Sequence, residues 1–350
     1  MKLNIVFPCF ATKASGGHKI LYEYINCLAE KGWRIDCFYF PQNTFYQLHL
    51  PDSFRKIFLS IYIRVFGPSK WFKLNKNVKN YLYSENHIRG ANIIVATGIE
   101  TAKPVMRLPD SCGKKVYFIQ DFENWNCTDE EVYTSYNLGM KNIVVAKWLK
   151  DLVDSHSEKP SYLVSNCINT EVFNDKGMER RKHSIVFHYR SADYKGPKYA
   201  IEAIRMLEVK YPDLKVDVIS IEDMPNSLPE SCTFHHKLNV EQIAEINNST
   251  QVFMCTSIEE GFGLPGLEAM ACGCAVVSSS YKGVLEYAVD GENALLSPVR
   301  DVDAMVNNII RLFEDDELRN KISENGVKTG KERSLEKSAQ KFEKVLLDCI

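Results

Sequence analysis

The stretch that decides the fold of this chain is SIVFHYRSADYKGPKYAIEAIRMLEVKYPDLKVDVIS (residues 184–220). Two short apolar runs, SIVFHY and KVDVIS, enclose a segment with helical periodicity at 197–210. A buried strand, a helix and another buried strand make the unit from which parallel sheets are built. Further apolar runs follow at 251–257 (QVFMCTS) and 274–280 (CAVVSSS). This half of the chain therefore predicts a parallel sheet with helices on both faces.

The first half of the chain shows the same alternation. Its apolar runs are LNIVF (3–7), RIDCFYF (34–40), NIIVAT (92–97), KVYFI (115–119) and NIVVA (142–146), with a helix near 17–31. The segment 162–184, polar and charged after a short strand, separates the two series and is the predicted interdomain linker. We therefore predict an α/β protein of two doubly wound domains that face each other across a cleft. The first domain covers 1–165, the second 166–333, and a last amphipathic helix 334–350.

Composition excludes several classes of protein. The 350 residues suit two domains, and a hydrophobic content of 45% can fill a core in each. A formal net charge of -2 gives no basic field, so we expect no nucleic-acid partner. The eleven cysteines form no CxxC pair and the histidines lack ligand spacing, so no metal site is expected. The opening MKLNIVF does not resemble a signal peptide, which predicts a cytoplasmic protein.

The segment SIEEGFGLPGLEAMACGCAVVSS (257–279) follows a predicted strand, and ligands of parallel sheets bind beyond strand ends. Glu260 lies in the loop, Gly261 and Gly263 let the backbone approach a ligand, and Glu268 falls near the start of the next helix. A helix start attracts phosphate, and a carboxylate near it accepts hydrogen bonds from sugar hydroxyls. The alternative is a tight turn with a carboxylate that complements the helix dipole. The whole constellation favours a ligand site.

A second loop, HYRSADYKGPKYAIEAI (188–204), presents Arg190 and Lys195 before a helix that starts near Pro197. Two cations at the end of a strand, beside a helix start, can neutralise a diphosphate. The alternative is that both are solvated surface cations. Because this loop belongs to the same predicted sheet edge as Glu260, we favour phosphate binding.

The loops of the first domain carry weaker signals. In PCFATKASGGHKI (8–20), Gly16, Gly17 and His18 stand where a helix begins, so the backbone there can approach a ligand. The spacing is not the dinucleotide fingerprint, and a helix cap by Ser15 is an equal alternative.

Three polar residues follow the strand at 115–119: Gln120, Asp121 and Glu123. One of them is a candidate contact to a sugar or an acceptor. Successive side chains alternate in direction, so not all three can face the cleft.

These segments resemble one family. The segment EEGFGLPGLEAMACG (259–273) is similar to the signature of the retaining glycosyltransferases of family 4. Glu260 and Glu268 reproduce the E-x7-E spacing of that signature. Members of the family have the GT-B fold of two Rossmann-like domains. SNCINTEVF (165–173) and GVLEYAVDGENALL (283–296) are similar to two further family motifs. The resemblance is dense in the second half of the chain and thin in the first.

The resemblance implies a role for each matching residue. Glu268 would bind the ribose of a nucleotide sugar, Arg190 and Lys195 would hold its diphosphate, and Glu260 would contact the transferred sugar. KLNVEQ (237–242) would contact the base. The implied donor-site residues are Gly16, Gly17, Arg190, Lys195, Leu238, Val240, Glu260, Gly261, Phe262, Gly263, Leu264 and Glu268. Of these, Arg190, Lys195 and Glu260 are the implied catalytic residues.

The family also implies a mechanism. It transfers sugars with retention of configuration and usually without an essential metal, so we expect no metal and no cofactor. Cations and a helix start can replace a divalent ion where the leaving diphosphate gains charge. Many members carry a histidine where this chain has Gln120 and Asp121, which with His18 remain candidates for sugar or acceptor contact. YFIQDFE (117–123) resembles a branch with bacterial rhamnosyltransferases of surface-glycan assembly. The terminal helix of such enzymes packs on the first domain.

The stretch 53–82 stands apart in composition. Apolar residues fall on one helical stripe, with basic residues opposite and more lysines, including Lys70, after it. A basic amphipathic stretch can lie on an anionic membrane, which would suit a lipid-linked acceptor and a peripheral location at the inner face of the plasma membrane. The alternative is a helix packed on the sheet with a solvated basic face. The sequence leaves both possibilities open.

Two other functions compete with glycosyl transfer to a glycan or lipid-linked acceptor. A nucleotide-sugar epimerase could use the same diphosphate pocket, but the chain offers no convincing acid and base pair around the sugar. A non-catalytic nucleotide-sugar-binding protein would be free to lose some of Arg190, Lys195, Glu260 and Glu268, and all four are present. Phosphorolysis with a pyridoxal cofactor lacks an identifiable lysine.

Overall fold

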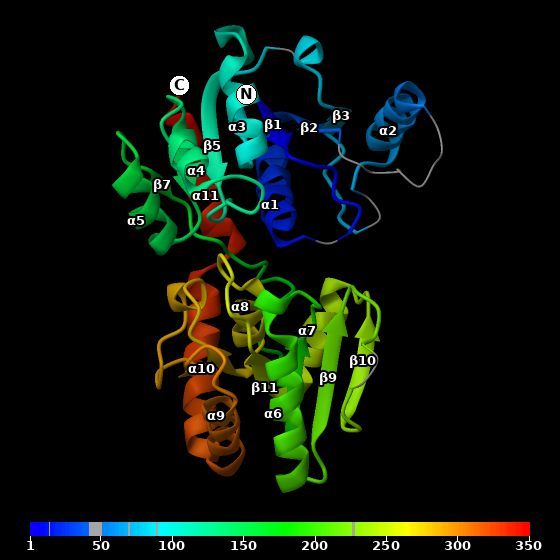
Figure 1. Ribbon diagram of the computed structural model, residues 1–350, viewed down its shortest axis with the longest axis vertical. Coiled ribbons are helices and arrows are strands. Elements are labelled where there is room, and N and C mark those ends of the chain that lie inside the picture. The colour runs from blue at the N-terminus through cyan, green and yellow to red at the C-terminus, as the bar shows by residue number, and fades with distance from the viewer. Residues whose placement is uncertain (14, 42–50, 69–70, 89, 226–227) are drawn as a thin grey trace. The chain divides into compact units, whose positions relative to one another are not determined.

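The computed structural model describes residues 1–13, 15–41, 51–68, 71–88, 90–225 and 228–350 (Figure 1). The chain divides into two compact units. The first comprises Met1–Asn166 together with Glu336–Ile350, and the second comprises Cys167–Leu335. The first unit is thus built from two separate parts of the chain.

The described strands of the first unit form a seven-stranded sheet in which every pair is parallel. They are β1 (Lys2–Phe7), β2 (Arg34–Tyr39), β3 (Val78–Leu82), β4 (Ile93–Ala96), β5 (Lys114–Ile119), β6 (Lys141–Val144) and β7 (Tyr162–Leu163). Their spatial order is β3-β2-β1-β4-β5-β6-β7. The order reverses between β1 and β4, where doubly wound sheets bind ligands.

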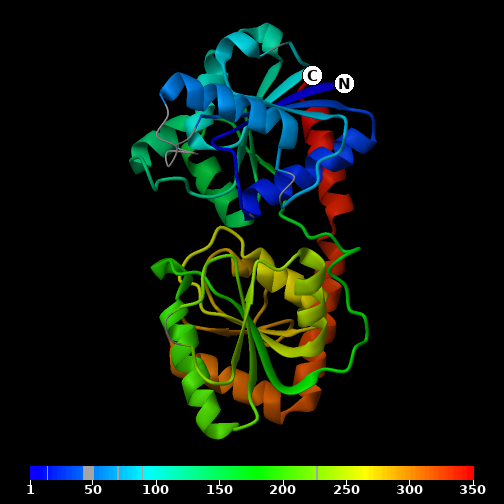
Figure 2. The ribbon, with the colours of Figure 1, turned by 90° about the vertical axis from the view of Figure 1, so that its right-hand side faces the viewer.

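Helices cover this sheet. They are α1 (Gly16–Glu30), α2 (Asp52–Phe66), α3 (Ile99–Arg107), α4 (Asp129–Ser135), α5 (Lys147–His156) and α11 (Leu335–Leu347). The last helix lies beside α1 (Figure 2), where the Phe342 ring stacks on Tyr24 at 5.0 Å between centroids. Among the helices that the structure describes, none is both long and apolar enough to cross a membrane.

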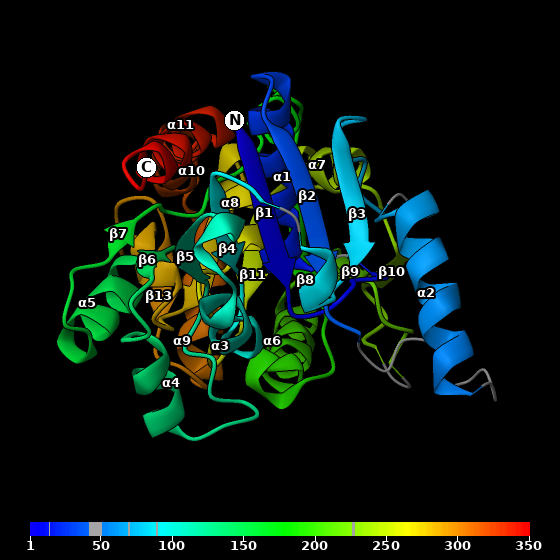
Figure 3. The same ribbon diagram turned by 90° about the horizontal axis from the view of Figure 1, so that it is seen from above.

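The second unit has a six-stranded sheet over its described residues, again parallel throughout. Its strands are β8 (Arg181–His188), β9 (Lys215–Ser220), β10 (Cys232–His236), β11 (Thr250–Cys255), β12 (Ala275–Ser279) and β13 (Leu295–Ser297). The order is β10-β9-β8-β11-β12-β13, so the switch point lies between β8 and β11 (Figure 3). Both units therefore have the predicted Rossmann-like topology.

Helices also flank the second sheet: α6 (Pro197–Lys210), α7 (Val240–Ser249), α8 (Leu264–Ala271), α9 (Val302–Glu314) and α10 (Asp316–Glu332). Apolar residues of α6 and α9 pack with alternate residues of the strands in one continuous core. Burial on this scale is the main stabilising contribution to such a domain.

Three of the strands that the structure describes were not predicted. β3 lies inside the stretch 53–82, where lysine and asparagine hide its pattern, so that stretch is a helix followed by a strand rather than a single amphipathic element. β10 is an edge strand with a polar sequence, CTFHH, and β13 has three residues. Short or edge strands lack the continuous apolar run that marks a buried strand.

Candidate functional site

The candidate site of the second unit is built on the loops after β8 and β11, the two strands at its switch point. Hydrogen bonds join the loops. The Ile258 amide donates to the Tyr194 carbonyl at 2.7 Å, and the Thr256 hydroxyl donates to the Gly196 carbonyl at 2.9 Å. The loop residues predicted from separate stretches of sequence are thereby fixed beside each other.

Gly196 is the point of closest approach between these loops. Its φ of +64° lies in the left-handed region, and a Cβ atom built on it would come within 2.1 Å of the Thr256 carbonyl oxygen. Only glycine fits here, because both the conformation and the space exclude a side chain. The next residue, Pro197, opens α6 with its preset φ.

An ion pair crosses between the two loops. Lys195 Nζ lies 3.0 Å from Glu260 Oε1, and the Ser257 hydroxyl donates to the same oxygen at 2.6 Å. The two charged side chains are largely buried, with 25% and 16% of their surface exposed. The structure thus brings together two predicted site residues and adds Ser257, which the sequence argument missed.

Arg190 lies at the end of β8 and is partly buried. Its Nη1 donates to the Tyr189 carbonyl at 2.8 Å. Burial lowers the pKa of the Arg190 guanidinium, while Glu222 and Glu260 act in the opposite direction. Glu222 follows β9 and accepts a hydrogen bond from the Ser191 amide at 2.7 Å, so it helps to hold the loop that carries Arg190. This role of Glu222 was also missed.

The start of α8 is held by buried tyrosines. Gly263, with a φ of +85°, precedes the helix, and a Cβ atom there would lie 2.0 Å from the Tyr281 hydroxyl. The Tyr287 hydroxyl donates to the Gly263 carbonyl at 2.7 Å. Leu264 is the first residue of α8, and Glu268, in its second turn, is 6% exposed. The turn predicted for Gly261 and Gly263 therefore leads directly into the helix that carries Glu268.

Phe262 is buried, with its ring 5.3 Å from that of Tyr287. Its side chain belongs to the core, so only its backbone can serve a ligand.

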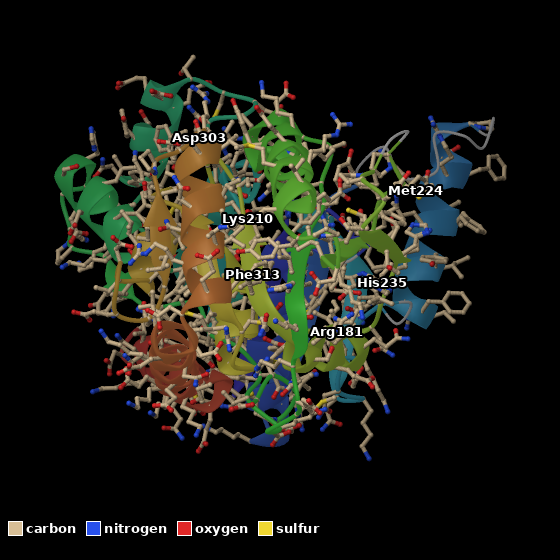
Figure 4. All side chains as sticks on the ribbon, turned by 90° about the horizontal axis from the view of Figure 1, so that it is seen from below. Arg181, Lys210, Met224, His235, Asp303 and Phe313 are labelled. Atoms are coloured by element: carbon tan, nitrogen blue, oxygen red, sulfur yellow. The ribbon has the colours of Figure 1, made fainter. Side chains whose placement is uncertain are left out.

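Leu238 and Val240 lie after β10, at the edge of the sheet. Val240 is the first residue of α7, and Leu238 lines a cavity of about 400 Å³. Arg181 and His235, labelled in Figure 4, line the same cavity and both contact the Asp217 carboxylate. This polar row spans β8, β9 and β10 and was not predicted.

A second cluster lies at the switch point of the first unit. The side-chain amide of Gln120 lies against Gly17, where a Cβ atom would be 3.0 Å from its oxygen. His18 Nε2 lies 3.1 Å from the Cys9 carbonyl, and its Nδ1 lies 3.3 Å from the Ser15 hydroxyl. Ser15 occupies the N-cap position of α1, as the capping alternative expected, but its side chain makes no cap hydrogen bond to the helix.

Asp121 and Glu123 point to different surroundings. Asp121 accepts a hydrogen bond from the Phe122 amide at 2.9 Å and is partly exposed. Glu123 is buried, where it accepts from the Ile99 amide at 2.5 Å and from the Tyr117 hydroxyl at 3.0 Å. Glu123 therefore holds the start of α3 and is not a candidate for ligand contact. This agrees with the expectation that Gln120, Asp121 and Glu123 cannot all face the same side.

Glu123 makes stability dependent on pH. Burial raises the pKa of Glu123 to about 8, although its two hydrogen bonds act in the opposite direction. The folded protein therefore keeps a proton that the unfolded chain releases above pH ~4.5, so the free energy of unfolding should fall as the pH rises from about 5 to 8. The slope has an upper limit of about 1.4 kcal/mol per pH unit. Thermal unfolding across this range should show that stability falls less with pH in Glu123→Gln than in the wild type, because the variant lacks the contribution of Glu123. The exposed Glu130→Gln should keep the wild-type slope; equal slopes in both variants would contradict the assignment.

Over the described ranges of the chain, no group of three or more histidine, cysteine, aspartate or glutamate side chains is arranged to hold a metal ion.

Comparisons with known proteins match the part of the chain that carries this site. Residues 169–329, which include both loops, match the family model described as Glycosyl transferases group 1. An uncharacterized glycosyltransferase of Methanocaldococcus jannaschii is 25% identical over 59% of this chain and 58% of its own length. A capsular polysaccharide biosynthesis glycosyltransferase of Staphylococcus aureus is 28% identical over 38% of this chain and 37% of its own. The chain thus spans little more than half of the first relative and less of the second.

A solved structure matches nearly the whole chain. The Anabaena protein HepE in complex with UDP-glucose superposes with a TM-score of 0.75 at 14% identity, covering 99% of both chains. At this identity the likeness shows the fold. It confirms the GT-B architecture that the motifs implied.

Proposed function

We propose that this chain, with its GT-B fold and group 1 glycosyltransferase segment, moves a hexose or deoxyhexose from a nucleoside-diphosphate sugar to a hydroxyl group of an acceptor. The observation that carries the proposal is the Lys195–Glu260 ion pair, which joins the two loops at the switch point of the second unit. A cation and a carboxylate meet there beside the start of α8. The leaving diphosphate and the sugar hydroxyls of a donor need these two kinds of group.

The ion pair suggests how the donor enters. A diphosphate competes with Glu260 for Lys195, and Arg190 adds a second cation. Once Lys195 turns to the phosphate, Glu260 Oε1 keeps its hydrogen bond from Ser257 and loses its contact with Lys195, so the carboxylate can accept a hydrogen bond from a sugar hydroxyl. Glu268, in the second turn of α8, is assigned to the ribose, and the segment at Leu238 to the base.

Charge stabilisation accounts for catalysis in this proposal. As the glycosidic bond to phosphate breaks, negative charge grows on the diphosphate, and Arg190, Lys195 and the amides at the start of α8 stabilise it without a metal. No carboxylate is assigned as a nucleophile, so we propose attack from the face that the diphosphate leaves. This gives retention of configuration, with the leaving phosphate accepting the acceptor proton.

The acceptor is proposed to be a glycan or a lipid-linked glycan of surface polysaccharide assembly. A relative named for capsular polysaccharide biosynthesis supports this, and YFIQDFE makes rhamnose a candidate among the donor sugars. His18, Gln120 and Asp121 of the first unit are assigned to sugar or acceptor contact. A lipid-linked acceptor further requires the protein to work at a membrane surface.

Thermal unfolding with a panel of UDP-, dTDP-, GDP- and ADP-sugars in EDTA tests the donor site. A donor at about 100 times its Kd should raise the free energy of unfolding by roughly 2.7 kcal/mol. One nucleotide class should give this shift with the wild type and not with Glu268→Gln. The matched control is Glu324→Gln, at an exposed position of α10, which should behave as the wild type.

The outcomes separate the competing functions. A metal-independent shift followed by sugar transfer, with the product anomer read by NMR, supports the proposal. A shift with no transfer to any acceptor favours a nucleotide-sugar-binding protein, and conversion of the donor to its isomer favours an epimerase. No shift with any nucleotide sugar would overturn the assigned roles of Glu268 and the donor loops.

A further inference from the structure

The helix α2 exposes an apolar surface. Phe54, Ile57, Phe58, Ile61 and Val65 have between 46% and 66% of their surface exposed. These five residues, called here the α2 stripe, recur three or four positions apart and therefore follow one face of the helix for roughly 16 Å. Monomeric proteins seldom expose a continuous row of large apolar side chains without a function.

The opposite face of α2 holds the helix to the first unit. Leu59 is 4% exposed and Ile63 is fully buried, and α2 packs against β3 at the end of the sheet (Figure 3). The Tyr62 ring lies 6.0 Å from that of Phe10. Only one side of α2 packs on the first unit, and side chains of its other side project outward (Figure 4). Neither sequence-based alternative foresaw this division.

Basic residues accompany the stripe. Residues 53–84 contain seven lysines and arginines and no acidic residue, although the whole chain has a net charge of -2. Lys56 and Arg64 on α2 are exposed, as are the lysines at 73, 76 and 79; Lys70 lies outside the described residues. Trp71 and Phe72 are half-buried, with their rings 5.6 and 5.4 Å from Tyr22, so they do not extend the stripe. With 3.6 residues per turn, Arg55 and Arg64 border the α2 stripe on its two sides, whereas Lys56 lies toward the opposite side of the helix.

We propose that α2 attaches this protein to the surface of an anionic membrane. The α2 stripe enters the boundary between headgroups and acyl chains, and the basic residues around it meet the phosphate groups of the lipids. This proposal deepens the proposed function, because a lipid-linked acceptor is met at such a surface. Its test does not depend on sugar transfer.

The charge distribution selects this occupant. In a two-fold dimer formed through the α2 stripe, the arginines that border the stripe in each copy would come together at one interface, where like charges repel. An anionic lipid surface neutralises those charges and offers hydrocarbon to the stripe along its whole length. Apolar insertion and charge attraction then act on the same helix.

Vesicle flotation tests the proposal with the full chain. The wild type should bind vesicles of phosphatidylglycerol and phosphatidylcholine, bind pure phosphatidylcholine weakly, and dissociate as salt rises. Ile57→Glu with Ile61→Glu should lower vesicle affinity more than tenfold. The matched control is Met206→Glu with Val209→Glu on α6, which adds two carboxylates at exposed apolar positions of the second unit and should not change affinity.

The basic residues have their own test. Arg64→Gln should lower affinity for anionic vesicles about fivefold. Lys103→Gln with Arg107→Gln, at exposed positions of α3, is the control and should have little effect. In a Phe54→Trp variant, tryptophan emission should shift to shorter wavelength on vesicle binding.

Three results would overturn the proposal: no binding of the wild type to anionic vesicles, equal binding of the α2 and α6 variants, or a wild-type dimer that the α2 variant dissociates in light scattering. The shift in unfolding temperature with a nucleotide sugar, measured without vesicles, reports separately on the donor site. An unchanged shift in the α2 variant shows that the fold is intact. Absence of that shift in the wild type would count against the proposed function and leave the vesicle result standing.

Discussion

Lys195→Ala should lower kcat for sugar transfer by about two to three orders of magnitude, the range found when a positioned charge-stabilising group is removed. Lys195 Nζ is placed at 3.0 Å from Glu260 Oε1 and is mostly buried, so water cannot replace its charge fully. The negative charge on the leaving diphosphate grows during the reaction. The effect on kcat should therefore exceed the effect on donor affinity.

Steady-state kinetics with the identified donor, together with the donor Kd from titration, measures both quantities. Lys198→Ala removes the same kind of side chain three residues later, at an exposed position of α6, and should change kcat less than twofold. A Lys195→Ala enzyme within threefold of wild-type kcat would refute the role given to Lys195. Circular dichroism and the unfolding temperature of both variants establish that each is folded.

Gly196→Ala should destabilise the second unit by about 2–5 kcal/mol, since left-handed strain of 1–2 kcal/mol adds to an overpacking cost of 1–3 kcal/mol. The new Cβ atom would meet the backbone oxygen of Thr256 at 2.1 Å, and a backbone atom cannot turn away as a side chain can. The loops after β8 and β11 must then separate. Lys195 moves away from Glu260 as a result, and donor affinity should fall with stability.

Gly177→Ala supplies the matched control. Gly177 has a φ of +63°, nearly that of Gly196, but nothing lies within 4 Å of its Cβ position. It should therefore show the conformational strain alone, about 1–2 kcal/mol, with donor binding unchanged. Thermal and urea unfolding compare the two variants. Equal losses would mean that the contact with Thr256 is unimportant.

The sequence predicted the residues of the donor loops but not what holds them. Arg190, Lys195 and Glu260 follow apolar runs, and the carboxyl ends of parallel strands share one sheet edge, so their meeting could be expected. Ser257 lies in the segment 257–279 that the sequence analysis singled out. Its hydrogen bond to Glu260 depends on the turn of the loop, which the sequence does not reveal. Glu222 was missed because its contact with the Ser191 amide depends on how the loops after β8 and β9 turn toward each other, which no motif marks.

The helix α2 shows a different limit of the sequence pattern. Its apolar residues occupy more than one face, and periodicity cannot tell which of them a neighbouring strand will cover. Contact with β3 buries Leu59 and Ile63, which are the less conspicuous members of the pattern. A strand hidden among lysines, β3, thus decided which side of the helix is exposed.

The discontinuous first unit sets an order of events during synthesis. Residues 167–335 form a continuous unit that can fold once residue 335 has left the ribosome. The first unit, although made earlier, lacks until then the helix whose Phe342 is fully buried and whose Glu343 pairs with Lys31 at 2.5 Å. The half of the protein that is translated first therefore completes its core last.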